Sequence, residues 1–388
     1  MSARRVIIVI ALLGVAHNGL RVLASMFGAR WGFFNYLQPF QWKPVTASNL
    51  PQIAGLIAVF VVVGFVARWG WRKPAANSSM WWCALWAASS GAVLGLLGVY
   101  VGVFPGHNYG WTMFVIVPLL VGFQAALTLG HWEQVTPHKA IAVGTSAVLL
   151  LGLLLLLFAI EGAICLLMAL PIAIPLAILG ALAGYTLRRK PAASHPATFL
   201  LLIGLAPFGA TIEHALQPSP EVFAVSTSID IPLAPERVWR TVLEPAHLAA
   251  PAHPLFRAGV AYPLASHIEG AGLTATRYCD FSTGKLVEPV IIWEDLHRLR
   301  FRVASNPLPM QEWTPYSRIH PPHLDGFLVS RQGEFQLEAL PNGGTRLKAT
   351  TWYEHGLWPS RYWKLWSDYI IHSVHAMVLE NTRARCRS

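Results

Sequence analysis

Two histidines and an aspartate stand within six positions of one proline-rich segment, His320-Pro-Pro-His-Leu-Asp325. Imidazole and carboxylate groups can bind a metal ion or transfer protons. A metal site would need a third protein ligand, for which His355 is the obvious candidate, but the two prolines favour an extended backbone that separates His320 from His323. A metal site, an acid–base pair and a lid fixed by backbone hydrogen bonds all stay open; we favour the lid and expect neither metal nor cofactor.

An arginine and a glutamate on neighbouring predicted strands form a second candidate site. Arg277 falls on the apolar side of the predicted strand Leu273–Phe281, and a buried arginine needs an anionic partner. Glu288, on the next predicted strand, is the candidate. Such a pair could hold the polar end of a ligand, could be structural, or could reach solvent at a strand end.

A third set of polar residues lies at the ends of predicted membrane helices, all on one face of the membrane. Its members are His107, Asn108, Tyr109, Glu161, Glu213 and His214. Ionisable side chains are costly to keep at membrane depth, so such residues often mark function. They form either a shared polar site or ordinary helix ends in headgroup water.

The acidic residues divide the chain into two halves. Only three of the nineteen Asp and Glu residues precede residue 217, and the basic residues of that part lie in short gaps between apolar runs. Membrane topology explains that placement, whereas nucleic-acid binding would cluster the bases on a water-exposed surface. We therefore predict a transmembrane domain at 1–216, a linker at 217–221, a soluble domain at 222–388, and no nucleic-acid partner.

Seven apolar runs approach the roughly 20 residues that a helix needs to span a bilayer. They are Val6–Phe27, Leu50–Val66, Trp81–Val103, Trp111–Leu129, Ala140–Ile160, Gly162–Tyr185 and Thr198–Ile212. The first could instead be a cleaved signal peptide. The last is short and contains Pro207, so it spans only if the bilayer thins locally and the residues at its ends snorkel to the interface.

The basic residues of the short loops give the orientation. Nine of them fall on one side of the predicted bundle and two on the other, which assigns the first side to the cytoplasm. We expect an integral protein of a bacterial inner membrane. Its soluble domain is extracytoplasmic if Thr198–Ile212 spans the membrane and cytoplasmic if it does not.

After residue 221 the long apolar blocks give way to the alternation that is typical of strands. Strands are expected at Phe223–Ile231, Leu273–Phe281, Lys285–Trp293, Arg298–Val303, Phe327–Leu337 and Thr345–Tyr353. A long helix is expected at Ser360–Arg385. Its predicted apolar face comprises Tyr362, Leu365, Trp366, Tyr369, Ile370, Val374 and Met377. His372 and His375 are predicted to lie on its solvated face.

Three motifs and the final helix carry a resemblance to a known superfamily. The motifs are Ile229-Asp-Ile-Pro-Leu-Ala-Pro-Glu-Arg-Val-Trp239, Glu288-Pro-Val-Ile-Ile-Trp-Glu294 and Leu299-Arg-Phe301. From about Val222 to Arg385 the chain resembles the START-like superfamily, also called SRPBCC or polyketide cyclase-like. The resemblance implies a helix-grip fold, in which a curved antiparallel sheet wraps a final helix around an apolar cavity for lipids, sterols, polyketides or plant hormones. It implies no particular chemistry.

The sequence thus predicts a bundle of about seven transmembrane helices followed by an α+β helix-grip domain, and three functions stay open. The first is a membrane-tethered protein that binds or transfers an apolar ligand, lipid or isoprenoid-like. In it Tyr353, Trp366 and Tyr369 line the cavity, Arg277 and Glu288 hold its polar end, and the His320–Asp325 loop gates it. The second is an enzyme that uses His320, His323 or Asp325 in proton transfer. The third is a membrane sensor or assembly factor with an unspecified protein partner.

Overall fold

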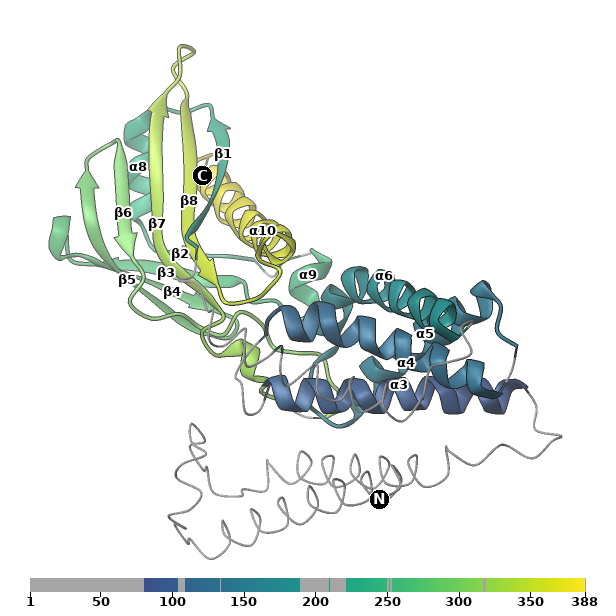
Figure 1. Cartoon of the computed structure of the whole chain (residues 1–388). Helices are drawn as coiled ribbons and strands as arrows, with labels where there is room; N and C mark the ends of the chain where they lie inside the picture. The colour runs from purple at the N-terminus through teal and green to yellow at the C-terminus, as the bar shows by residue number, and fades with distance from the viewer. Residues whose placement is uncertain are drawn as a thin grey trace, which may run out of the picture. The chain divides into compact units, whose positions relative to one another are not determined.

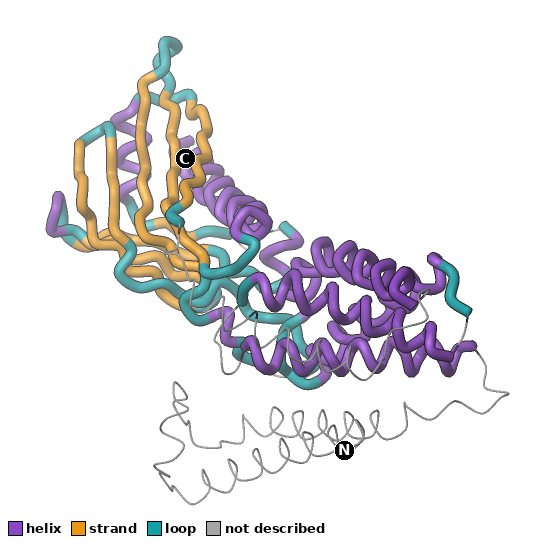
Figure 2. Tube along the Cα trace, in the orientation of Figure 1, coloured by secondary structure: helices purple, strands orange, loops and turns teal. Residues whose placement is uncertain are grey.

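The chain folds into two compact units. The computed structural model describes residues 80–103, 109–132, 134–188, 209, 221–249, 251, 253–316 and 319–387. The first unit extends to Gln217 and includes Thr314–Ile319, and the second comprises the remaining residues from Pro218 onward. The first is helical, and the second contains all the described strands (Figures 1 and 2).

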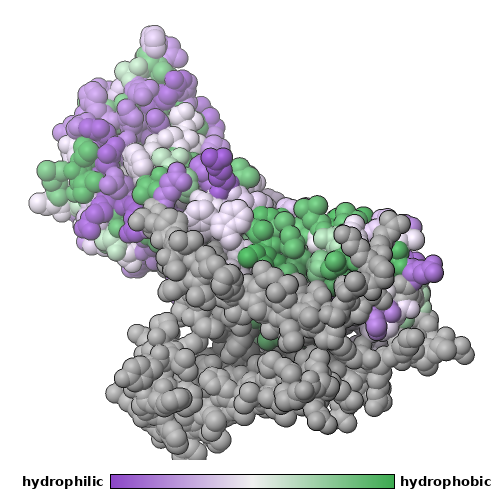
Figure 3. All heavy atoms as spheres, in the orientation of Figure 1, coloured by the Kyte–Doolittle hydropathy of each residue, from purple (hydrophilic) through white to green (hydrophobic). Residues whose placement is uncertain are grey.

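The helical unit consists of long apolar helices. They are α3 (Met80–Val103), the π-helical turn η3 (Thr112–Ile116), α4 (Val117–Trp132), α5 (Pro137–Leu157) and α6 (Ala163–Arg188). Four segments are long and apolar enough to cross a membrane: Met80–Val99, Thr112–Trp132, Pro137–Leu157 and Ala163–Leu187. In Figure 3 hydrophobic side chains gather over this unit, whereas much of the visible surface of the sheet unit is hydrophilic.

These four spans match four of the seven predicted apolar helices. The predicted helices Val6–Phe27 and Leu50–Val66 lie outside the described residues, and of Thr198–Ile212 only Gly209 is described. The number seven therefore stays a prediction.

Helices α4 and α6 pack with their backbones in contact. A Cβ atom added at Gly122 would lie 1.9 Å from the carbonyl oxygen of Ala177, and one at Gly180 would lie 1.9 Å from that of Leu119. Only glycine fits at these positions. Small residues at helix crossings are a common way for helices to associate in lipid, where close van der Waals packing replaces the hydrophobic effect.

The second unit is built on an eight-stranded sheet in the order β1-β8-β7-β6-β5-β4-β3-β2, with every neighbouring pair antiparallel. The strands are β1 (Phe223–Ile231), β2 (Ala246–His247), β3 (Pro263–Glu269), β4 (Thr276–Phe281), β5 (Gly284–Glu294), β6 (Arg298–Arg302), β7 (Leu328–Ala339) and β8 (Thr345–His355). The helical elements are α8 (Pro235–Leu243), α9 (Pro254–Arg257), the short 3-10 turns η4 (Gly272–Thr274) and η5 (Pro322–Leu324), and α10 (Ser360–Arg387).

The six predicted strands and the final helix are confirmed, with small differences at their ends. The predicted strand Leu273–Phe281 begins only at Thr276, because Gly272–Thr274 forms a 3-10 turn that leaves Leu273 exposed. Strand β3 was not predicted, since its sequence Pro-Leu-Ala-Ser-His-Ile-Glu lacks a clear alternation of apolar and polar residues.

Helix α10 lies along one face of the sheet (Figure 1) and joins its core. Leu379 and Cys386 belong to the same buried cluster as Trp239 and Leu347. The curved antiparallel sheet and the long C-terminal helix are consistent with the helix-grip fold.

The predicted buried face of α10 was wrong in part. Leu365 is 68% exposed and Tyr369 is 47% exposed. The residues that are buried instead are Trp363, Ser367, Ile370, His375, Leu379, Thr382 and Cys386. They follow helical spacing, but several are polar and bond to the sheet or to the helix itself, so a search for apolar periodicity selected the neighbouring aromatic residues instead.

Two leucines of α10 test this orientation with the same substitution. Leu379→Ala is expected to destabilise the sheet unit by about 2–5 kcal/mol, because it leaves a cavity in the core. Leu365→Ala, on the exposed side, should change stability by less than about 0.5 kcal/mol. Thermal denaturation of the detergent-solubilised full chain measures both variants, and equal losses would contradict the assigned face.

Candidate functional site

A cavity of about 160 Å³ lies between α10 and the sheet. Its wall is mostly apolar: Ile370, Val374 and Val378 contribute from the helix, and Phe301 and Phe335 from strands β6 and β7. A buried water needs only about 15 Å³ by a comparable measure. The space is therefore large enough for a small organic molecule.

A segment that follows β6 lies against this cavity and is held in three places. The Asn306 side chain donates to the Ser330 carbonyl at 3.1 Å and accepts from the Ser330 amide at 2.9 Å. The Thr283 hydroxyl donates to the Leu308 carbonyl at 2.6 Å, and the Ala261 amide donates to the Pro309 carbonyl at 3.0 Å. Asn306–Pro309 forms part of the cavity wall.

The predicted gate, the loop from His320 to Asp325, lies outside the cavity wall. His320 Nε2 is 2.8 Å from Asp325 Oδ1 in an exposed pair, whereas buried His323 has its Nε2 at 3.5 Å from Glu312 Oε1. The two imidazoles thus face different carboxylates, as the extended Pro-Pro backbone suggested. The part of the connection between β6 and β7 that adjoins the cavity is Asn306–Pro309, near its beginning.

His355 lies in the aromatic packing near the end of β8. Its ring stacks on Phe223 with 5.3 Å between centroids and lies 6.2 Å from the ring of Tyr353. Burial lowers the pKa of His355. The residue is therefore neutral at neutral pH and contributes to packing.

The predicted pair of Arg277 and Glu288 is formed, and it lies in the cavity wall. The two residues stand opposite each other on β4 and β5, and the guanidinium donates a hydrogen bond to the carboxylate. Both side chains are at most 10% exposed. The guanidinium also lies over the rings of Phe301 and Phe335, at 5.1 and 5.5 Å from their centroids.

Burial shapes the protonation of this corner of the cavity. It raises the pKa of Glu288, and the Arg277 guanidinium opposes that rise. Burial also raises the pKa of the adjacent Cys279 thiol to about 11, so the thiol stays protonated at neutral pH. Whether this pair holds a ligand remains a prediction.

Three aromatic residues that were predicted to line the cavity lie outside its wall. Tyr353 is fully buried, but its hydroxyl donates to Asp368 at 2.5 Å and thus ties β8 to α10. Trp366 is half-buried, and the exposed Tyr369 places its hydroxyl 3.3 Å from His253 Nε2. The residues of α10 that line the cavity begin at Ile370, directly after Tyr369.

His375 is the cavity residue that the sequence analysis misplaced. It is buried and lines the cavity, with its Nε2 at 2.8 Å from the Thr351 hydroxyl and its Nδ1 at 3.2 Å from the Thr227 hydroxyl. Burial, with a smaller contribution from neighbouring His372, lowers the pKa of His375 to about 4. The alternation of β1 places Thr227 on the same side as inward-facing Ile229 and Ile231, but nothing local in the sequence links Thr227 to His375.

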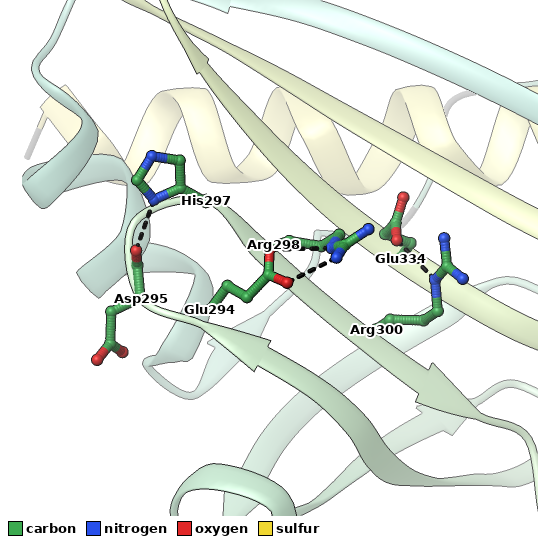
Figure 4. A network of polar contacts seen from close by, with 6 residues as sticks. All are labelled: Glu294, Asp295, His297, Arg298, Arg300 and Glu334. Atoms are coloured by element: carbon green, nitrogen blue, oxygen red, sulfur yellow. Dashed lines mark hydrogen bonds and ion pairs between the residues drawn. The ribbon is translucent and has the colours of Figure 1, made fainter.

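Strands β5, β6 and β7 carry two further ion pairs (Figure 4). Arg298 bonds to Glu294 and Arg300 bonds to Glu334, each at 2.6 Å. Arg300 also lies 4.6 Å from the centroid of the Trp352 ring. These arginines lie on the outer face, because Leu299 and Phe301, which alternate with them along β6, point into the core.

In the helical unit, two members of the predicted membrane polar set are bonded to each other. The Tyr109 hydroxyl donates to Glu161 Oε1 at 2.6 Å, and both side chains are buried. The other members, His107, Asn108, Glu213 and His214, lie outside the described residues.

Comparison with known proteins gives only distant structural likenesses. No family model matches the chain, and no curated protein matches it. Norcoclaurine synthase of Thalictrum flavum, bound to a transition-state analogue, is 10% identical over 44% of this chain and 97% of its own, with a TM-score of 0.29. XoxI of Bacillus cereus is 14% identical over 42% and 96%, with a TM-score of 0.28, and Ara h 8.0201 is 10% identical over 43% and 98%, with a TM-score of 0.27. At these scores the likenesses carry no argument of their own, so the fold rests on the strand order and the closing helix.

The buried ion pair predicts an asymmetric pattern of stabilities. Arg277→Met is expected to cost about 3–5 kcal/mol, since it leaves Glu288 buried without its cation. Adding Glu288→Leu should recover part of that loss, because no buried charge then remains. Arg298→Met, which removes an exposed partner of Glu294, is the control and should change the melting temperature little. A double variant less stable than Arg277→Met alone would contradict the pairing.

His375 predicts a loss of stability in mild acid. The unfolded chain binds a proton there near the ordinary histidine pKa of 6.5, but the folded chain does so only near 4. Stability from this group is therefore complete above about pH 6.5 and falls as the pH drops towards 4, by at most about 1.4 kcal/mol per pH unit. Burial of His355 acts in the same direction.

Thermal denaturation at about pH 5 and about pH 7 measures this effect. The difference in melting temperature between the two pH values should shrink in His375→Gln. It should persist in His320→Gln, which changes an exposed histidine. If His375→Gln and the wild type lose stability equally on acidification, the burial of His375 as a neutral group is wrong.

Proposed function

We propose that the sheet unit binds an apolar small molecule and that the helical unit anchors it in a membrane. The observation that carries this proposal is the cavity of about 160 Å³ between α10 and the sheet, with a buried ion pair in an otherwise mostly apolar wall. Ligand pockets in proteins are typically apolar with a few placed polar groups. A cavity of this kind gives an apolar ligand the hydrophobic gain of leaving water.

The size of the cavity favours a compact ligand. It is comparable with the ~150 Å³ cavity that accommodates a benzene-sized guest. A single ring or a short isoprenoid therefore fits better than a phospholipid with two chains. A larger ligand requires movement of the Asn306–Pro309 segment, whose hydrogen bonds to Ser330 and Thr283 are few enough to break and re-form.

The polar corner favours a neutral hydrogen-bonding group on that ligand. Arg277 and Glu288 together carry no net charge, so they attract a free ion only weakly. They do present N–H donors and carboxylate oxygens side by side. A hydroxyl, carbonyl or amide can bond to either.

The apolar helices support the membrane part of the proposal. Four segments meet the length and composition of a membrane span. An apolar ligand is sparingly soluble in water, and a binding domain tethered beside a bilayer meets a higher local concentration of it. The proposed role is reception or transfer of such a molecule at the membrane.

Native mass spectrometry of the full chain, released from lipid nanodiscs after exposure to a total lipid extract, tests the proposal. The wild type is expected to carry a bound small molecule. Val378→Trp, which fills the cavity from α10, should lose it. Leu365→Trp introduces the same side chain on the exposed side of α10 and should retain it.

The two variants also distinguish a loss of ligand binding from a loss of folding. Both must keep a melting temperature close to that of the wild type, which shows that the sheet unit is folded. An empty wild-type protein, or an identical adduct on both Trp variants, would remove the cavity as the binding site.

A further inference from the structure

Four side chains form a continuous hydrogen-bonded chain from the cavity wall to the protein surface. Thr351 Oγ1 lies 2.8 Å from His375 Nε2, His375 Nδ1 lies 3.2 Å from Thr227 Oγ1, and Thr227 Oγ1 lies 2.8 Å from His372 Nδ1. Thr351 and His375 line the cavity, whereas His372 is exposed. Strands β8 and β1 supply the threonines, and α10 supplies both histidines.

The donor and acceptor roles in this chain are strongly constrained. A neutral imidazole has one N–H and one acceptor nitrogen, and a hydroxyl has one hydrogen to donate. With both histidines neutral, only two arrangements run in a single direction from one end to the other. Either Thr351 donates to His375, His375 to Thr227 and Thr227 to His372, or every bond points in the reverse direction. A third arrangement, in which the Thr227 hydroxyl accepts from both histidines, cannot pass a proton through Thr227.

The two arrangements present different groups to the cavity. In the outward arrangement the Thr351 hydrogen is used by His375, so its oxygen is left to accept from a ligand. In the inward arrangement Thr351 accepts from His375, and its hydrogen is free to be donated to a ligand. The same hydroxyl therefore serves as acceptor or donor, according to the direction of the chain.

We propose that these four side chains relay a proton between the cavity and solvent, so that the cavity is an acid–base site for a ligand with an exchangeable hydrogen. This rests on the proposed binding function and adds chemistry to it. The ligand class is a compact apolar molecule with a hydroxyl group or a carbon acid next to a carbonyl.

The proton balance closes without any further reactant. Thr351 takes a proton from the ligand and passes its own to Nε2 of His375, which releases its Nδ1 proton to Thr227. Thr227 passes its proton to Nδ1 of His372, and His372 releases its Nε2 proton to water. The ligand is left as its conjugate base, no group is oxidised or reduced, and each side chain ends neutral.

After one proton has passed from the ligand to solvent, the four side chains are in the inward arrangement. In this arrangement Thr351 can return a proton to the ligand, either at the same atom or at another atom that has gained electron density. Removal and return of a proton is what an isomerisation or a hydrogen exchange requires. The burial of His375 suits this role, because a histidine that stays neutral passes protons without storing charge.

Nuclear magnetic resonance of the full chain in lipid nanodiscs, with ¹⁵N-labelled histidine and no added ligand, tests the relay. Signals of His375 are assigned by their loss in His375→Gln. In the wild type, each ring nitrogen of His375 should show a ¹⁵N chemical shift between the values of a protonated and an unprotonated ring nitrogen, because the two arrangements interconvert. Exchange of its ring proton with solvent deuterium should be fast.

Thr227→Val breaks the chain in the middle with little change in side-chain shape. His375 should then adopt a single tautomer, and its ring-proton exchange should slow by about tenfold, the scale set by losing one hydrogen bond. Thr227→Ser should restore both properties. Ser226→Ala is the control, because exposed Ser226 precedes Thr227 on β1, points to the other face of that strand and is not part of the cavity wall, and it should change neither.

Unchanged tautomer averaging and exchange in Thr227→Val would overturn the proposal. If the remaining histidine signals show that this variant is misfolded, His372→Gln at the exposed end decides instead. Glutamine cannot pass a proton, so exchange must slow there too, and an unchanged rate would equally overturn the relay. These measurements contain no ligand, so they test the relay independently of ligand binding. If the relay works but the protein binds no small molecule, only the binding proposal is refuted.

Discussion

The packing of α10 against the sheet is the constraint on which the structure of the sheet unit depends. At one end the helix is held by hydrogen bonds, such as that between Tyr353 and Asp368. At the other end it is held by apolar contacts, in which Leu379 packs with Trp239 and Leu347. Between these attachments the aliphatic side chains of α10 do not fill the curve of the sheet, and the cavity is the space that remains.

The cavity has a polar feature on each of two walls, and neither carries net charge at neutral pH. On β4 and β5 the Arg277 guanidinium neutralises Glu288. On β8 and α10, Thr351 bonds to a histidine that burial keeps neutral. A desolvated free charge would be costly in such a space, whereas a neutral pair or a hydroxyl is tolerated and can still direct a ligand. In the proposed function, the same apolar surroundings set both the class of ligand and the kind of chemistry.

Much of the fold could be predicted from local patterns. Strand alternation, turn residues and apolar run length are properties of short windows, and they located six strands, the closing helix and four long apolar helices. The pair of Arg277 and Glu288 was also predictable, because a period of two fixes which side chains share a face and neighbouring strands bring them together. The prediction of the α10 face failed for Leu365 and Tyr369, because the apolar and aromatic residues beside the buried stripe gave a stronger apolar signal than the stripe, which includes Ser367, His375 and Thr382.

By itself the sequence determined that one half is helical and apolar and the other mixes strands and helices, the order of the predicted elements, and which residues share a face along the predicted strands. Only the tertiary structure decided which helix face meets the sheet, which part of the connection between β6 and β7 adjoins the cavity and which histidine lies in the cavity wall. Those facts depend on contacts between residues as distant in the chain as Thr227 and His375. No short window contains both partners of such a contact, so the chemistry of the cavity emerges only when the sheet closes on the helix.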